Sequence, residues 1–258
     1  MMKNLTLSLF CVGLLSTVAM AEDMCNATYQ AGNYTQSAQC YIKQLKKERS
    51  FDNLFRAGAS LVMQQRFQEA LPYLTEAEKK APSLDDFAGI YSFLGTTYSY
   101  LGNSKQEYHY LMKGLEIELK LGNPNNIATS YHNLGAYYAK ESQPEKALEY
   151  YEKALKYREE SEKGVTYNNL AVLYGNMGDM KKKEEMCLKA IASAEKFEKY
   201  RELGAYKGNL GIFYFIQSRY DEAKVVMNEA LVIAQKIGLK ETEASALEVL
   251  SLIEKAKK

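Results

Sequence analysis

Three stretches of the chain, YHNLGAYY (residues 131–138), YNNLAVLY (167–174) and KGNLGIFY (207–214), share one pattern. Each has an Asn directly before a Leu, a Gly or Ala directly after that Leu, and a Tyr three residues further on. The stretches recur at spacings of 36 and 40 residues. A self-similar pattern at such spacings predicts an array of repeated structural units.

The pattern extends to a fourth copy around Leu94 and Gly95. Apolar residues within each copy recur at helical spacing, as Leu94, Tyr98 and Leu101 do. Turn sequences separate these apolar stretches, and in one of them, Ser142-Gln143-Pro144, Ser142 is predicted to cap the next helix. We therefore predict pairs of helices, in which the small residue after each Leu allows two helix backbones to approach closely.

This pattern resembles the tetratricopeptide repeat, in which a Leu-Gly pair, a Tyr and later Ala and Pro residues recur in each copy. Residues 51–84 form another copy at the standard length of 34 residues, with Gly58, Ala70, Leu74, Ala77 and Pro82 in register. In such arrays, stacked neighbours bury a continuous core. The resemblance implies an all-α fold, a right-handed α-solenoid of stacked antiparallel helix hairpins.

The resemblance also implies one solenoid domain over residues 22–258. Its repeats are expected at 22–50 (a degenerate copy), 51–84, 86–122, 124–162, 163–200 and 201–238, with a capping helix at 240–258. We expect the apolar face of that last helix to run through Ala244, Leu247, Leu250 and Ile253. The copies longer than 34 residues resemble the repeats of adaptor proteins such as kinesin light chain.

The first 21 residues have the features of a cleaved signal peptide. Lys3 precedes an apolar run over residues 5–20, and Ala19-Met20-Ala21 has the small residues of a cleavage site. The alternative is a membrane anchor, but a span needs about 20 apolar residues, more than this run has. We expect cleavage between Ala21 and Glu22, and a periplasmic or secreted protein with no membrane-inserted segment.

The charge of the chain is balanced, with 33 basic and 32 acidic residues. The charges are interspersed along the predicted helices, so we expect neither nucleic acid nor anionic lipid as a partner. The sequence has two His residues and no phosphate-binding loop, nucleophile elbow or metal-binding spacing. We therefore expect no enzymatic activity, no cofactor and no metal, and a monomer or a weak homo-oligomer.

Three Cys residues follow the predicted leader: Cys25, Cys40 and Cys187. An odd number in an oxidising compartment suggests one disulfide and one free thiol. In the alignment of the repeats, Cys25 falls at the small-residue position of a first helix, and Cys40 faces it from the second helix. We therefore predict a disulfide between Cys25 and Cys40, and a buried thiol at Cys187.

The packing of a helix hairpin does not explain the repeated Asn. Asn is a poor helix former, so Asn133, Asn169 and Asn209 each cost about half a kcal/mol relative to Ala. In the families that the chain resembles, the first helix of each repeat lines a concave surface. An Asn at this position there can bind the backbone of a ligand peptide. The alternative is that each amide bonds to the neighbouring repeat and only fixes its register.

We predict the peptide-binding role, with further candidates on the same surface identified by helical offset from the Asn residues. These candidates are His132, Asn168, Val172, Asn176, Ile212 and Phe215, and the same offset also places Gly208 and Ile216 on this surface. The surface lacks the basic clamp with which chaperone-binding relatives hold an acidic tail. The expected ligand is therefore an extended peptide or an amphipathic helix with apolar anchors.

Two classes of function remain open at this point. The first is a non-enzymatic scaffold of the cell envelope that binds a peptide or helix of a partner protein on its concave surface. The second is a structural subunit or regulator that is permanently assembled in an envelope complex through its convex or end surfaces.

Overall fold

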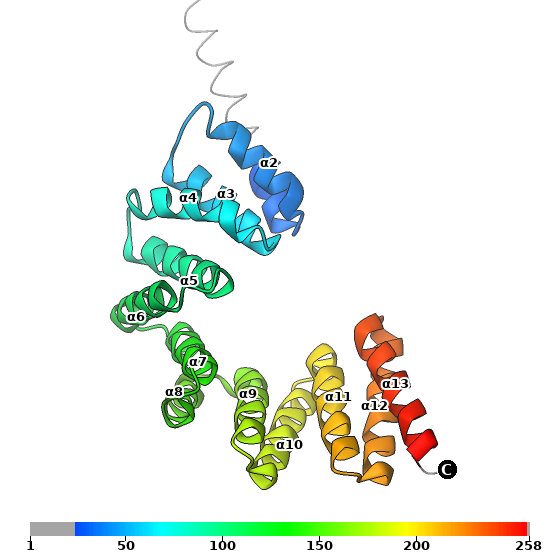
Figure 1. Ribbon diagram of the computed structural model, residues 1–258. Coiled ribbons are helices and arrows are strands. Elements are labelled where there is room, and N and C mark those ends of the chain that lie inside the picture. Colours follow the sequence, from blue (N-terminus) through cyan, green and yellow to red (C-terminus); the bar gives the residue numbers. More distant parts are fainter. Residues whose placement is uncertain (1–23, 257–258) are drawn as a thin grey trace, which may run out of the picture. The chain divides into compact units, whose positions relative to one another are not determined.

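The computed structural model describes residues 24–256, and within this range every regular element is a helix (Figure 1). The all-α fold class is therefore confirmed. The predicted leader and its cleavage site lie outside the described residues. The helices divide into two compact units, one up to Gly122 and one from Asn123 onward, and each is described by itself.

The first unit begins with a helical segment over residues 24–30. It continues with α2 (Tyr34–Gln44), α3 (Phe51–Met63), α4 (Phe67–Glu78), α5 (Leu84–Tyr100) and α6 (Ser104–Leu121). Successive helices pack against each other, and their apolar faces form one core that includes Leu54, Leu61, Leu74 and Leu94. The unit is thus a stack of helix hairpins.

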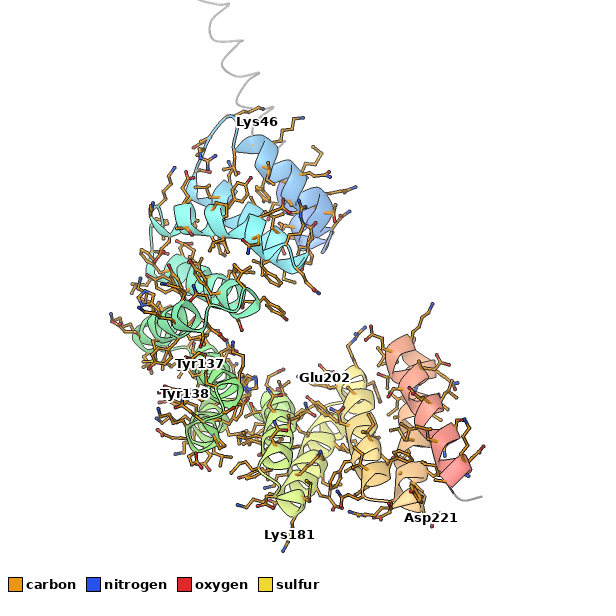
Figure 2. All side chains as sticks on the ribbon, viewed as in Figure 1. Lys46, Tyr137, Tyr138, Lys181, Glu202 and Asp221 are labelled. Carbon is orange, nitrogen blue, oxygen red and sulfur yellow. A yellow bond between two sulfur atoms is a disulfide. The ribbon has the colours of Figure 1, made fainter. Side chains whose placement is uncertain are left out.

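The second unit repeats this arrangement. It consists of α7 (Pro124–Lys140), α8 (Pro144–Tyr157), a short 3-10 helix η1 (Glu160–Glu162), α9 (Lys163–Asn176), α10 (Met180–Lys196), α11 (Tyr200–Ile216), α12 (Tyr220–Ile237) and α13 (Lys240–Ala256). Lys181 and Asp221, in the first turns of α10 and α12, lie at one end of this unit, whereas Glu202, in the first turn of α11, lies at the other (Figure 2). Neighbouring helices are therefore antiparallel, as the predicted solenoid requires.

The small residue after each repeated Leu makes room for a side chain sixteen positions later. An ideal Cβ on Gly135 would lie 2.7 Å from the Tyr151 ring. One on Gly211 would lie 2.8 Å from Met227, which also follows it by sixteen residues. Because real Cβ atoms do not come so close to ring or chain atoms, even a methyl group at these positions forces the partner to move.

The predicted disulfide between Cys25 and Cys40 is confirmed. It joins the helical segment over residues 24–30 to α2, with the two Cα atoms 5.5 Å apart. Cys25 is fully buried, in the core of the first unit. Cys187 is a free cysteine and is buried in α10, as predicted.

The turns between the helices of a hairpin have a shared geometry. Gly178, with a φ of 81°, precedes Asp179, whose side chain accepts a hydrogen bond from the backbone of Lys182 in the first turn of α10. The prediction that Ser142 caps α8 is wrong: the cap residue is Gln143, and Ser142 has a φ of 56°. Ser142 therefore occupies the left-handed position that Gly178 fills in the next hairpin.

The orientation of α13 also differs from the prediction. The helix buries Ala246, Val249 and Ile253 against the unit, whereas Leu247 is 50% exposed. Both sets of residues have helical spacing, so the sequence pattern of α13 fits two faces. Packing against α11 and α12 selects the face with Ala246 and Val249.

Candidate functional site

The predicted site residues all lie on the first helices of three successive hairpins in the second unit. His132 and Asn133 are in α7, Asn168, Asn169, Val172 and Asn176 in α9, and Asn209, Ile212 and Phe215 in α11. We call the accessible side of α9 and α11 the first-helix face, and define it by Asn168, Val172, Asn176, Asn209, Ile212 and Ile216. Two pairs of its members are 40 residues apart, Val172 with Ile212 and Asn176 with Ile216.

The amide of Asn169 contacts the preceding hairpin. Its Nδ2 lies 3.0 Å from Nε2 of His132, and the Nδ1 of His132 lies 3.1 Å from the hydroxyl of Thr166. Since an amide nitrogen can only donate, Nε2 accepts, and the ring proton is therefore on Nδ1, from which it is donated to Thr166. Thr166 is fully buried. One neutral imidazole thus connects α7 to two positions of α9.

The surroundings of His132 keep its ring neutral. Burial, and secondarily the positive charge of Arg158, lower the pKa of His132 to about 4. Its ring packs edge-on against Tyr151, with 5.3 Å between the ring centroids. Protonation of Nε2 would replace the bond from Asn169 with two opposed donors, so the contact depends on the neutral form.

Asn209 makes the equivalent contact one hairpin later. Its Nδ2 donates to Oδ1 of Asn168 across 3.0 Å. Asn168 stands in α9 where His132 stands in α7, directly before the repeated Asn. The two contacts therefore follow one rule, in which the repeated Asn donates to the residue that directly precedes the repeated Asn of the preceding hairpin. Asn169 donates to His132, which precedes Asn133, and Asn209 donates to Asn168, which precedes Asn169. This is the geometry expected if the amides fix the register of the stack.

The three repeated Asn residues are therefore not alike. Asn169 is half-buried and held by His132, whereas Asn209 is exposed and its bond to Asn168 is at the surface. Asn133 is half-buried in α7, the first helix of its unit, so no preceding hairpin of that unit lies beside it. Of the three, Asn209 is the most accessible to a ligand.

Apolar side chains are exposed beside these amides. Val172 is 53% exposed and Ile212 is 37% exposed. Ile216, which helical offset from Asn209 also places on this surface, is 67% exposed. Phe215 is half-buried and packs against Tyr220, with 5.7 Å between the ring centroids. Asn176 is exposed at the end of α9.

The charged group closest in sequence to Asn209 is neutralised within the chain. Lys207 makes ion pairs with Glu195 at 2.9 Å and with Glu229 at 2.7 Å, and only 13% of its side chain is exposed. The first-helix face consists of amide and aliphatic side chains alone. It can therefore offer hydrogen bonds and apolar contacts, and its own residues supply no charge for an ionic ligand.

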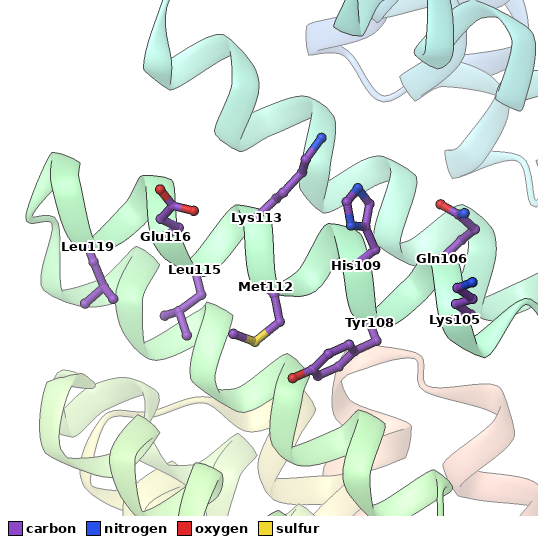
Figure 3. Close-up of a pocket in the computed structure, with 9 residues that line it drawn as sticks. All are labelled: Lys105, Gln106, Tyr108, His109, Met112, Lys113, Leu115, Glu116 and Leu119. Atoms are coloured by element: carbon purple, nitrogen blue, oxygen red, sulfur yellow. The ribbon is translucent and has the colours of Figure 1, made fainter.

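A second accessible surface lies on α6 in the first unit. Figure 3 shows the side chains of α6 that line a pocket, with Tyr108, Met112, Leu115 and Leu119 on one side of the helix. His109 and Lys113 extend to the other side. Leu115 is buried, whereas Leu119 is 46% exposed. This surface contains none of the predicted site residues.

Between residues 24 and 256, no group of His, Cys, Asp and Glu side chains is arranged to hold a metal ion. In the same part of the chain, no helix has both the length and the apolar character needed to cross a bilayer.

Comparison with known proteins identifies the repeat. Family models described as tetratricopeptide repeat match residues 86–160 and 165–196. No curated protein matches the sequence.

Solved structures share the fold. BtubC (BKLC) from P. vanneervenii is 21% identical, with a TM-score of 0.64 over 81% of this chain and 91% of that chain. The apo form of the quorum sensor NprR from B. thuringiensis is 16% identical, with a TM-score of 0.72 over 88% of this chain and 68% of that chain.

A signal transduction ATPase with a tetratricopeptide repeat sensor, from Pyrococcus horikoshii, is also similar. It is 20% identical, with a TM-score of 0.67 over 92% of this chain and 38% of that chain. Identities this low establish a shared fold rather than a shared partner. Together with the two family matches and the hairpin stacks of both units, they show that the chain contains tetratricopeptide repeats, over residues 86–160 and 165–196.

Proposed function

We propose that the chain is a non-enzymatic interaction scaffold of the cell envelope, which binds a peptide or an amphipathic helix of a partner protein on its first-helix face. Tetratricopeptide repeat folds generally serve as scaffolds for protein–protein interaction. The observation that carries the proposal is the exposure of Val172, Ile212 and Ile216 next to exposed amides on adjacent first helices. Clustered apolar residues with polar neighbours are typical of interaction surfaces.

The proposed location in the periplasm or outside the cell rests on two features. The first is the leader-like sequence over residues 1–21, with its small residues before Glu22. The second is the Cys25–Cys40 disulfide, because disulfides persist mainly in oxidising compartments. Export would also place the first-helix face among envelope proteins, from which its partner would come.

The amides are proposed to act in two ways. Asn169 fixes the register between hairpins through His132, whereas Asn209 and Asn168 remain accessible for a ligand. Neutral amides and aliphatic side chains favour a ligand that is itself uncharged where it contacts this face. This division leaves the binding role to Asn209, which is exposed, and to Asn168, which is half-buried.

A second candidate function is a permanently assembled envelope subunit that contacts its partners through second helices. The observation that favours it is the exposure of apolar residues on α12, where Val225 is 58% exposed and Val232 is 64% exposed. These two side chains are as accessible as those of the first-helix face. A subunit of this kind would lose its assembly, rather than a peptide ligand, when α12 is changed.

Paired double variants distinguish the two candidates. The mature chain would be used to capture partners from an envelope fraction, with Val172→Glu/Ile212→Glu compared with Val225→Glu/Val232→Glu. All four side chains are exposed, so both variants should fold, which melting curves would verify. The scaffold proposal expects loss of the captured protein only for the first variant. Loss only for the second variant would favour the assembled subunit and contradict the scaffold proposal.

A further inference from the structure

One Gly of α11 has no packing role within the chain. Gly208 is half-buried in the middle of the helix, and an ideal Cβ on it would meet nothing within 4 Å. By contrast, a Cβ on Gly204 or Gly211 of the same helix would contact Ile233 or Met227. Gly is the poorest helix former after Pro. Gly208 therefore weakens α11 without giving space to any described side chain.

The open space over Gly208 adjoins the first-helix face. Ala205 and Ile212, each one helical turn away on α11, are exposed. The equivalent position in α9, forty residues earlier, is Asn168, which receives the hydrogen bond from Asn209. The open space over the Gly208 backbone thus lies next to the side chain of Ile212 and to the amides of Asn168 and Asn209.

The amide pair is suited to an extended chain. Once Nδ2 of Asn209 has donated to Oδ1 of Asn168, the Oδ1 of Asn209 and the Nδ2 of Asn168 have no other hydrogen bond to residues 24–256. They offer one acceptor and one donor. A helix has already paired its own backbone groups, whereas an extended peptide has unpaired N–H and C=O groups to bind.

The lack of charge decides which side chain fits. Lys207, the charged residue next to Gly208, is held by Glu195 and Glu229. An ionic side chain over Gly208 would therefore lose hydration without gaining an opposite charge. An apolar side chain would instead gain contact with Ile212 and with the exposed helix backbone.

We propose that the space over Gly208 is a subsite for a large apolar side chain of an extended peptide whose backbone pairs with Asn168 and Asn209. This inference rests on the proposed function, because it requires a peptide on the first-helix face. It adds the class of residue that the peptide must carry, and it identifies Gly208 as the position that determines specificity.

The test is a selection from a phage-displayed library of random twelve-residue peptides on the mature chain. Selected peptides would then be titrated against wild type, Gly208→Leu and the control Ala192→Leu. Ala192 is exposed on α10, a second helix, so the control adds the same bulk away from the subsite. We expect peptides that share a Phe, Leu, Ile or Met, and a loss of affinity of about tenfold or more for Gly208→Leu only.

The outcomes distinguish a failure of peptide binding from a failure of the subsite over Gly208. If wild type enriches no peptide, binding of an extended peptide fails and the subsite falls with it. The capture experiment with Val172→Glu/Ile212→Glu then decides whether the first-helix face binds a helix of a partner. If peptides are enriched but bind Gly208→Leu as tightly as wild type, or if they share a charged rather than an apolar residue, the subsite alone is overturned.

A second variant covers the case in which Gly208→Leu does not fold. Gly208→Ala should raise the melting temperature by about 2–4 °C, because Ala is the better helix former and its Cβ meets no neighbour. The same variant should weaken peptide binding several-fold. A lowered melting temperature would show that Gly208 has a structural role and would overturn the subsite.

Discussion

Asn169 of α9 donates a hydrogen bond from Nδ2 to Nε2 of His132 in α7, across 3.0 Å, and so connects two consecutive hairpins. When one partner of a hydrogen bond inside a protein is removed, the loss of stability exceeds what the bond contributed, because the other polar group is left unsatisfied. The contact therefore gives the repeated Asn a structural role at this position. This differs from the peptide-binding role predicted for all three copies, which remains proposed for Asn209.

The first prediction is that Asn169→Ala lowers stability, whereas Asn209→Ala does not. Removing Asn169 leaves Nε2 of His132 without its donor, so the free energy of unfolding should fall by about 1–2 kcal/mol. Asn209 is exposed, so Ala should be neutral or stabilising by a few tenths of a kcal/mol. Urea unfolding of the two variants would check this. Equal losses at both positions would mean that the two contacts have the same structural role.

The second prediction concerns acid. The pKa of His132 is lowered to about 4 in the folded chain, against about 6.5 for an unperturbed His. As pH falls through this interval, the unfolded chain takes up a proton that the folded chain does not, so stability is lost between about pH 6.5 and pH 4. Above pH 6.5 the imidazole is neutral in both states. At about pH 4 the loss in the free energy of unfolding should approach about 3 kcal/mol.

His132→Gln isolates this effect from the carboxylates that also titrate in acid. The variant should lose stability less steeply than wild type between pH 6.5 and pH 4. His109→Gln, a change at the exposed His of α6, should follow the wild-type curve. Identical pH profiles for wild type and His132→Gln would show that the folded and unfolded chains protonate the imidazole at the same pH.

The third prediction is that Gly135→Ala destabilises the second unit. The added Cβ would lie 2.7 Å from the Tyr151 ring, and overpacking of this kind costs about 1–3 kcal/mol. At the equivalent positions of the next hairpin, the chain has Ala171 and Cys187. The double variant Gly135→Ala/Tyr151→Cys copies that pair, so it should recover part of the loss. Ala136→Val, at an exposed neighbour, serves as the control in the same melting experiment.

The hairpins, the cysteine pairing and the small residues were predictable because each depends on a local repeat. The residue that each Gly accommodates, sixteen positions later, follows from the same register. The face that α13 buries was not predictable, because two apolar stripes of the sequence fit it and packing with α11 and α12 selects one. A contact of the Asn residues with the neighbouring repeat was the alternative to peptide binding. Its partner His132 was not predictable, since the contact joins residues 37 positions apart whose side-chain directions a pattern does not contain.

The fourth prediction concerns the left-handed turn positions. Ser142 and Ser218 have φ values of 56° and 57°, where Gly178 has 81° in the equivalent turn. A residue with a Cβ costs roughly 1–2 kcal/mol in this conformation, whereas Gly adopts it freely. Ser142→Gly and Ser218→Gly should therefore each stabilise the chain by about 1 kcal/mol, after the greater flexibility of unfolded Gly is subtracted. Gly178→Ser should have the opposite effect on the melting temperature, and stabilisation by that change would contradict the argument.

The last prediction concerns the three cysteines after the leader-like segment. Cys25 and Cys40 are joined across a separation of 15 residues, and for a loop of this length chain entropy predicts about 3 kcal/mol of stabilisation. Burial raises the pKa of the Cys187 thiol, which keeps it protonated and slow to react. Alkylation of the folded, non-reduced chain should therefore modify none of the three, and alkylation after unfolding should modify Cys187 alone.

Reduction should lower the stability of the first unit and leave the second unchanged, because the disulfide lies wholly within the first. Peptide mapping that found Cys25 and Cys40 both alkylated without reductant would contradict the pairing. A uniform loss of stability in both units would contradict a stabilising effect of the disulfide that is confined to the first unit.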